Sequence, residues 1–74
     1  MDAKTVGERL RELRGGQRIN DVSRNIDVCR SALSMYETGK RIPRDEIKVR
    51  IANYFGRSVQ EIFYDENNDT TDRA

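Results

Sequence analysis

The segment from Asp21 to Pro43 constrains the fold more than any other part of the chain. Its apolar residues recur at intervals of three or four, which gives each of two short helices a single buried stripe. These residues are Val22 and Ile26 in the first helix, and Leu33 and Tyr36 in the second. Val28 lies between the helices, where a tight turn needs an apolar residue beneath it. The segment therefore predicts two helices joined by a short turn.

The rest of the chain as far as residue 64 also has helical spacing, with recognisable signals at the helix ends. The expected helices span residues 6–14, 18–26, 30–37 and 45–55, followed by a short fifth helix that contains Val59, Ile62 and Phe63. Capping boxes begin the first and the fifth helix, and their members are Thr5 with Glu8 and Ser58 with Glu61. Gly15 and Gly56 are expected to end the first and the fourth helix.

Composition limits the kinds of chemistry that the chain can perform. It has 74 residues, one cysteine and no histidine, so we expect one small domain. The lack of histidine excludes histidine-assisted nucleophilic catalysis, and the lone Cys29 excludes an intramolecular disulfide and a structural zinc site. The sequence has neither a membrane-spanning apolar run nor a signal-peptide core. We therefore expect a cytoplasmic protein that is not an enzyme and carries no metal or cofactor.

Charge is unevenly distributed along the chain. The overall net charge is +1, but residues 1–64 carry net +4 and residues 65–74 carry net −3. Residues 30–44 alone contribute net +3. Such a local excess is typical of a surface that binds phosphate, although it also fits an ordinary solvated surface. We divide the chain into a folded domain, residues 1–64, and an acidic tail, residues 65–74, that is expected to be disordered.

Three segments, in this order, resemble one protein family. They read VGERLRELR at residues 6–14, RSALSMYETGKRIP at residues 30–43 and IANYFGRSVQEIF at residues 51–63. The middle segment is the most specific, with Tyr36-Glu37 followed by Gly39-Lys40-Arg41. The chain resembles the lambda-repressor-like helix-turn-helix proteins, of the XRE or Cro/CI type, over about four fifths of its length. The resemblance implies an all-α, compact five-helix domain with the helix-turn-helix at helices 2 and 3.

The same resemblance places the second helix of the helix-turn-helix in the major groove of DNA. The residues expected to contact bases are Arg30, Ser31, Ser34 and Met35. The residues expected to contact phosphates are Lys40, Arg41 and Arg44 in the following loop, and Gln17, Arg18 and Asn20 as candidates around the start of helix 2. Met35 fits equally well as cover for the edge of the core. Glu37 is expected to pair with a nearby cation.

The chain departs from the family pattern at three places. Gly15-Gly16 marks a shortened connection, which leaves open which residue of helix 2 contacts phosphate. Asp27 replaces the usual turn glycine, at a position that commonly needs a positive φ. Cys29 replaces the Ser or Thr that caps the recognition helix, so we expect a weaker cap. Its thiol has two interpretations, a redox sensor beside DNA or a small half-buried residue.

These features predict a sequence-specific, double-stranded DNA-binding transcriptional regulator, most simply a repressor of prokaryotic or phage origin. It would bind a pseudo-palindromic operator as a homodimer, because one recognition helix contacts too few base pairs for useful specificity. In the resembling family the last helix is the usual dimer contact, and the apolar residues expected there are Tyr54, Val59, Ile62, Phe63 and Tyr64. The alternative is a protein-interaction module, such as an antitoxin or adaptor, built on the same fold. No small-molecule ligand and no membrane contact are expected.

Overall fold

The computed structural model describes residues 1–64, which form five helices and no strand. The helices are α1 (Ala3–Arg14), α2 (Ile19–Asn25), α3 (Arg30–Glu37), α4 (Asp45–Phe55) and the short π-helix η1 (Gln60–Tyr64). The prediction of an all-α, five-helix domain is therefore confirmed. The acidic tail that the sequence predicts, residues 65–74, lies outside the described residues.

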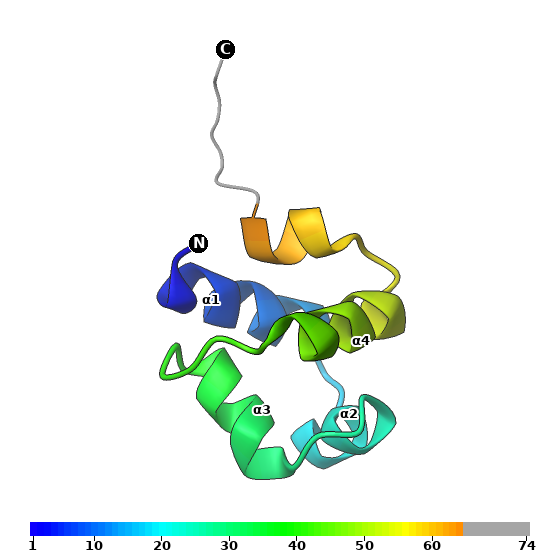
Figure 1. The fold of residues 1–74 in the computed structure, drawn as a ribbon. Coiled ribbons are helices and arrows are strands. Elements are labelled where there is room, and N and C mark those ends of the chain that lie inside the picture. Colours follow the sequence, from blue (N-terminus) through cyan, green and yellow to red (C-terminus); the bar gives the residue numbers. More distant parts are fainter. Residues whose placement is uncertain (65–74) are drawn as a thin grey trace.

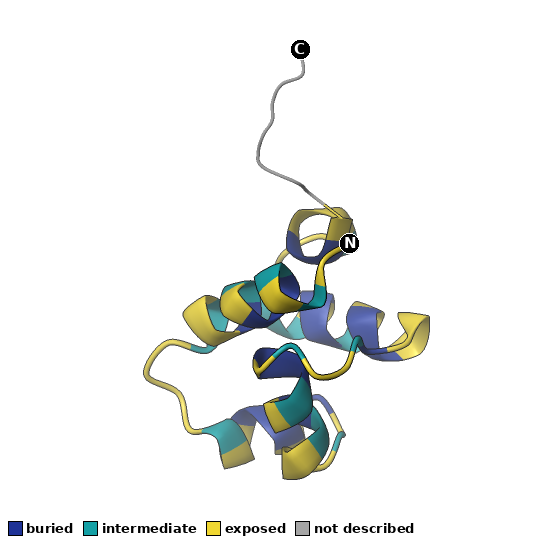
Figure 2. Cartoon of the chain, turned by 90° about the vertical axis from the view of Figure 1, so that its left-hand side faces the viewer, coloured by how far each residue is buried: buried dark blue, intermediate teal, exposed yellow. Residues whose placement is uncertain are grey.

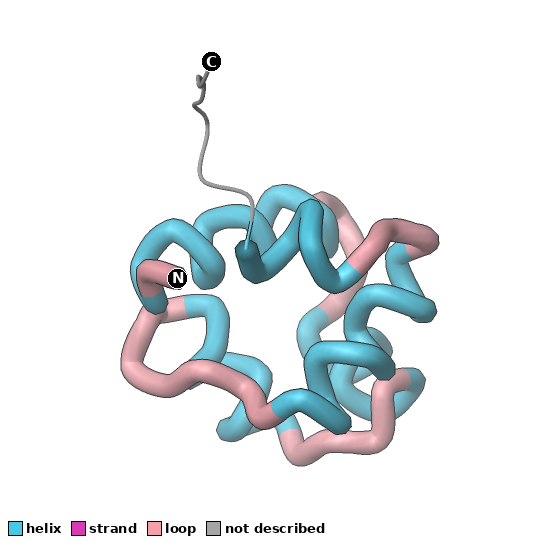
Figure 3. The backbone as a smooth tube through the Cα atoms, turned by 45° about the horizontal axis from the view of Figure 1, so that its top comes forward, coloured by secondary structure: helices cyan, strands magenta, loops and turns pink. Residues whose placement is uncertain are grey.

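The five helices are arranged in layers. α1 and α4 occupy the middle of the molecule, with η1 on one side of them and the α2–α3 pair on the other (Figure 1). A view from the side shows the same order, with the buried surfaces of the helices turned toward one another (Figure 2). The longest connection between described helices, residues 38–44, joins α3 to α4 (Figure 3). Within residues 1–64, every helix is too short or too polar to span a membrane.

A single apolar core joins the layers, and α1, α2, α3, α4 and η1 all contribute to it. Its buried side chains are Val6, Leu10, Val22, Ile26, Leu33, Tyr36, Ile47, Ile51, Ala52, Ile62 and Phe63. The spacing of three and four residues read from the sequence brings these side chains onto the inner surface of each helix. Leu13 and Ile19 are only partly buried and pack against the edge of the core.

The start of α1 differs from the prediction that Thr5 would cap it. Asp2 is the N-cap, and its carboxylate accepts hydrogen bonds from the Thr5 backbone N–H at 3.2 Å and from the Thr5 hydroxyl at 2.7 Å. Aspartate caps a helix as well as serine does, and Thr5 supplies one of the N–H groups that the first helical turn leaves unpaired. α1 is therefore three residues longer at its start than the capping box predicted.

The other helix ends agree closely with the sequence. α3 and α4 have the predicted bounds, and α2 begins one residue later than expected, at Ile19. Gly56 ends α4 in the left-handed conformation, with φ 69°. The second capping box is confirmed, because the Ser58 N–H donates to Glu61 Oε1 at 2.9 Å and the Glu61 N–H donates to Ser58 Oγ at 3.0 Å.

α1 and α3 approach each other unusually closely at Gly7. A Cβ atom added to Gly7 would lie 2.8 Å from the carbonyl oxygen of Tyr36 and still nearer to that of Glu37. Only glycine fits at this crossing, because both obstacles are backbone atoms of α3. The absence of a side chain at Gly7 therefore fixes the distance between α1 and the end of α3.

Two cations and two buried apolar side chains attach η1 to the other helices. Ile62 and Phe63 are 2% and 1% exposed, so the prediction that they lie at a dimer interface is corrected: they belong to the core of the protomer. The ammonium group of Lys48, itself buried, donates to the Tyr64 hydroxyl at 2.8 Å. Arg9 donates to the carbonyl oxygen of Ile62 at 2.9 Å. The sequence pattern gave no sign of either cation's role.

Candidate nucleic-acid interface

α3 has one buried side and one exposed side. Leu33, Tyr36 and Glu37 are buried, whereas Arg30, Ser31 and Ser34 are exposed and Met35 is half-buried. The four residues predicted to contact bases thus all lie at least partly at the surface. A helix of this kind presents one cation and two hydroxyls outward, which are the groups that pair with base edges in the major groove.

The turn between α2 and α3 is held by backbone hydrogen bonds and by α4. Asp27 has φ 60°, so the prediction of a positive φ is confirmed. The Val28 N–H donates to the carbonyl oxygen of Ser23 at 3.0 Å, which closes the turn. Arg50 of α4 donates to the carbonyl oxygen of Asp27 at 3.1 Å and to Glu46 at 2.9 Å. The direction in which α3 leaves the turn is therefore fixed by a contact with α4.

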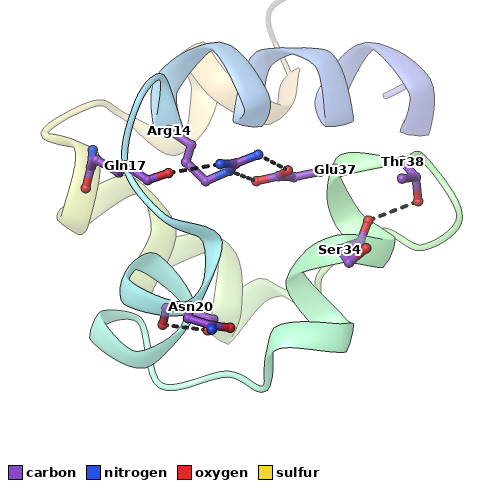
Figure 4. A network of polar contacts seen from close by, with 7 residues as sticks. Arg14, Gln17, Asn20, Ser34, Glu37 and Thr38 are labelled. Atoms are coloured by element: carbon purple, nitrogen blue, oxygen red, sulfur yellow. Dashed lines mark hydrogen bonds and ion pairs between the residues drawn. The ribbon is translucent and has the colours of Figure 1, made fainter.

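An ion pair between Arg14 and Glu37 fixes the other end of α3. Arg14 Nε donates to Glu37 Oε2 at 2.7 Å, and the second guanidinium nitrogen donates to Oε1 at 3.0 Å. A third hydrogen bond, 2.9 Å long, runs from Arg14 to the carbonyl oxygen of Gln17 (Figure 4). The bonds to Glu37 raise the pKa of Arg14 above its ordinary value, so the guanidinium stays charged. Glu37 is thus paired with a cation, as predicted.

Three exposed cations lie in and after the loop that follows α3. The loop turns at Gly39, with φ 78°, and the Lys40 N–H donates to the carbonyl oxygen of Met35 at 2.9 Å. Lys40, Arg41 and Arg44 are exposed, and within residues 1–64 none of their side chains forms a hydrogen bond or an ion pair. Pro43 is buried and anchors the loop. The cations are therefore held near α3 by the backbone while their charged groups face water.

The three candidates around the start of α2 differ in their contacts. Arg18 is the N-cap and is exposed, and the side chain of Asn20 is exposed on the first turn. Gln17 is also exposed, but its side-chain oxygen accepts a hydrogen bond from the Tyr54 hydroxyl. Its amide nitrogen is then directed away from Tyr54 and remains a donor. Tyr54, predicted for a dimer interface, is thus also a link between α4 and the α1–α2 connection.

Side-chain capping distinguishes two groups of helices. α1 and η1 begin with side-chain caps at Asp2 and Ser58. The N-cap residues of α2, α3 and α4 are Arg18, Cys29 and Arg44, whose side chains make no capping hydrogen bond. The absence of a thiol cap at Cys29 confirms the expected weak cap. No N-cap side chain therefore satisfies the first N–H groups of these three helices, which are groups that an anion can bind.

Cys29 lies at the surface beside the groups predicted to contact bases. It is exposed, which contradicts the interpretation as a half-buried residue. Its Sγ lies 3.4 Å from the Ser31 hydroxyl. The hydrogen bond with Ser31, aided by the backbone N–H of Ala32, lowers the pKa of the thiol below its ordinary value. Among residues 1–64, no group of three metal-ligating side chains is close enough to hold a metal ion.

Known proteins share this arrangement. Residues 8–62 match the helix-turn-helix family model. The restriction-modification controller protein C.AhdI from Aeromonas hydrophila is 26% identical over 84% of this chain and 97% of its own, with a TM-score of 0.77. The clp gene regulator ClgR from Corynebacterium glutamicum is 22% identical over 84% of this chain and 68% of its own, with a TM-score of 0.76.

A third solved structure covers more of the chain. The SOS-response transcriptional repressor LexA from Eubacterium rectale is 16% identical over 99% of this chain and 80% of its own, with a TM-score of 0.83. At such identities, the likeness to ClgR and LexA shows the fold alone. Among curated proteins, none matches the chain significantly.

Proposed function

Because the chain belongs to the XRE-type helix-turn-helix family of DNA-binding transcription regulators, we propose that it binds a specific double-stranded DNA operator, most simply as a prokaryotic or phage repressor. One observation carries the proposal: the exposed side of α3 ends in a loop whose three cations have no partner within residues 1–64. A repressor of this kind needs no catalytic step, because occupying the operator blocks the polymerase.

Base recognition is assigned to the exposed side of α3. Arg30, at the start of the helix, has the fork geometry to donate to guanine O6 and N7 together. Ser31 and Ser34 donate or accept, so each discriminates weakly alone. Met35 is half-buried, and its exposed part suits contact with a thymine methyl group. Arg30 is therefore expected to dominate sequence preference.

Phosphate binding is assigned to the residues on either side of α3. Lys40, Arg41 and Arg44 would hold the backbone of one strand, and Gln17, Arg18 and Asn20 the backbone near the start of α2. The unpaired N–H groups at the starts of α2, α3 and α4 support this assignment, because phosphate oxygens satisfy such groups and favour the positive end of a helix dipole.

A homodimer would place two copies of α3 on half-sites about one helical turn, or roughly 34 Å, apart. The apolar surface left for the contact consists of Tyr64, which is 40% exposed, and the half-buried Val59 and Tyr54. η1 lies on the opposite side of the molecule from α2 and α3, which leaves α3 free for DNA (Figure 1).

Binding-site selection from a random duplex library, followed by affinity measurements over a range of salt concentrations, tests DNA recognition. Arg30→Ala should cost about 1–3 kcal/mol and relax the preference at one base pair, whereas Lys40→Ala should weaken all sequences alike. Arg57→Ala is the matched control, because it removes the same charge from the α4–η1 connection. An unchanged ranking of operators in Arg30→Ala would refute the base contact. Absence of any salt-dependent duplex binding would favour the protein-interaction module instead.

Sedimentation of wild type and Val59→Glu tests the dimer. Val59 is half-buried at the edge of the core and precedes η1, where a glutamate suits the helix start, and circular dichroism would verify that the variant keeps its fold. The variant is expected to be monomeric and to lose the advantage of a palindrome over a single half-site. A wild type that stays monomeric at high concentration would contradict the proposed interface.

A further inference from the structure

We propose that Lys4, on the first turn of α1, completes a phosphate-binding clamp with Lys40 and Arg41 of the loop after α3. The inference rests on the proposed function, because it concerns the same DNA. It adds a cation that precedes Lys40 by more than thirty residues and belongs to α1, a helix outside the helix-turn-helix. The partner group is the DNA backbone phosphate next to the one held by the loop.

The first observation is the packing of the loop on the start of α1. A Cβ atom added to Gly39 would lie 3.1 Å from Lys4 Cα, 3.3 Å from Lys4 N and 3.4 Å from the carbonyl oxygen of Ala3. Gly39 therefore touches the backbone of Lys4, and Lys40 is the next residue along the loop. The N-terminus and the α3–α4 connection lie on the same side of the molecule (Figure 1).

The second observation is that, within residues 1–64, no ion pair or hydrogen bond engages the charged groups of this cluster. Lys4 is exposed, and like Lys40 and Arg41 its side chain forms no hydrogen bond or ion pair within residues 1–64. Three positive side chains that leave neighbouring stretches of backbone create a local positive potential that attracts phosphate. A lysine side chain has a flexible four-carbon stem, so its ammonium group has the reach to contact a neighbouring phosphate.

Within residues 1–64, the nearby carboxylates form no ion pair with the three cations. Glu37, at the end of α3, is buried and forms two hydrogen bonds with Arg14. Asp2 accepts hydrogen bonds from the N–H and the hydroxyl of Thr5, which turns its carboxylate toward the helix start. The hydrogen bond from the Thr5 hydroxyl, then that from the Thr5 N–H, lowers the pKa of Asp2, and the positive charge of Lys4 adds to this effect. Asp2 therefore stays charged close to Lys4, and its charge opposes the binding of a phosphate there.

The third observation is that the position of Lys4 relative to α3 is rigid. Gly7, one turn further along α1, lies directly against the carbonyl oxygens of Tyr36 and Glu37. The start of α1 therefore moves with the end of α3 as one body. When α3 enters the major groove, Lys4 and the loop approach the DNA backbone together.

A salt series on the selected operator tests the inference in the full chain. Each phosphate contact contributes about −0.9 to the slope of log affinity against log salt. Lys4→Ala should remove one contact and make the negative slope shallower by about 0.9. Raising salt from about 50 to about 200 mM would then weaken DNA binding by the variant about 3.5-fold less than binding by wild type. The ranking of operator variants should not change. Arg57→Ala should keep the slope of wild type.

A scan with methylphosphonate, which removes the charge of one phosphate at a time, locates the contact. One phosphate should lose its effect on binding in Lys40→Ala, which identifies it as the contact of Lys40. In wild type, neutralising the phosphate next to it should also weaken binding. In Lys4→Ala, neutralising that neighbouring phosphate should have no effect, while the effects of the other phosphates remain. Asp2→Asn, which keeps a good N-cap but removes a negative charge, should strengthen binding at low salt.

The outcomes separate the inference from the proposed function. If Lys4→Ala matches Arg57→Ala in salt slope and in the methylphosphonate scan while Lys40→Ala still loses a phosphate, the clamp is overturned and DNA recognition stands. If wild type shows a salt-dependent affinity for duplex DNA that none of the variants Lys4→Ala, Lys40→Ala and Arg30→Ala changes, the proposed function itself is refuted.

Discussion

Replacing Arg14 by methionine should destabilise the fold more than the loss of one surface charge. Methionine keeps most of the apolar stem and removes the guanidinium that forms two hydrogen bonds with Glu37. The Glu37 side chain is only 6% exposed, so in Arg14→Met its carboxylate would stay out of water without a counter-charge. The hydrogen bond from Arg14 to the carbonyl oxygen of Gln17 would be lost as well.

The magnitude follows from the burial of the two partners. Removing one member of a buried ion pair costs about 3–5 kcal/mol, because the other charge remains desolvated. The Arg14 side chain is 23% exposed, so water would partly replace it, and we expect the lower limit of about 3 kcal/mol. Domains of this size have an unfolding free energy of about 4–11 kcal/mol. The thermal midpoint should fall by roughly 12–24 °C.

Urea unfolding followed by circular dichroism measures this loss, at a low temperature at which the variant starts folded. Arg11→Met is the matched control on the exposed part of α1, with an expected change within about 0.5 kcal/mol. Adding Glu37→Leu to Arg14→Met should restore most of the stability, because an apolar pair carries no desolvated charge. A loss below about 1 kcal/mol in Arg14→Met, or a double variant no more stable than Arg14→Met, would refute the argument.

Three further changes test other parts of the fold. Gly7→Ala should lower the thermal midpoint, because the new methyl group meets the backbone oxygens of α3 at a cost of about 1–3 kcal/mol; a higher midpoint would show that the helices separate easily. Asp27→Gly should stabilise the protein by about 0.5–1 kcal/mol in urea unfolding, since glycine adopts φ 60° without strain, and a loss would mean that the aspartate side chain has a favourable contact. The hydrogen bond to Tyr64 raises the pKa of Lys48, so its contribution to stability is complete below about pH 10.4 and disappears as the pH rises through the raised value. Tyr64→Phe should reduce that alkaline loss of unfolding free energy, and an unchanged alkaline profile would contradict the assigned contact.

Local signals predicted most of the secondary structure. The bounds of α3 and α4 follow from apolar spacing together with Gly56, and the positive φ of Asp27 follows from its place in the turn. These features depend on residues within one or two turns of each other, where spacing and backbone sterics decide the conformation. The capping signal at Thr5 was ambiguous, because Asp2 has the same three-residue relation to Thr5 as Thr5 has to Glu8.

Contacts between distant residues were not predictable in this way. The cation that pairs with Glu37 is Arg14, 23 positions away, and only the crossing of α1 and α3 selects it from the many basic residues. The burial of Lys48 and its hydrogen bond to Tyr64 could not be predicted from the sequence either, because lysine is rarely buried and nothing in the spacing of α4 distinguishes Lys48 from an exposed lysine. The apolar residues Ile62 and Phe63 were assigned to an interface because the sequence cannot say how much of η1 the rest of the molecule covers.

The attachment of η1 has a consequence for how the molecule opens. This short helix lies on the far side of α1 and α4 from α2 and α3, and it is held by Ile62, Phe63 and the hydrogen bonds from Arg9 and Lys48 (Figure 2). We expect a short terminal segment so placed to open locally at a free energy no greater than that of unfolding the whole domain. Association through η1 would add its binding energy to that opening step. Hydrogen exchange of the η1 amides would then slow as protein concentration rises, whereas amides of α2 and α3 that exchange through local openings leaving η1 in place would not respond to concentration.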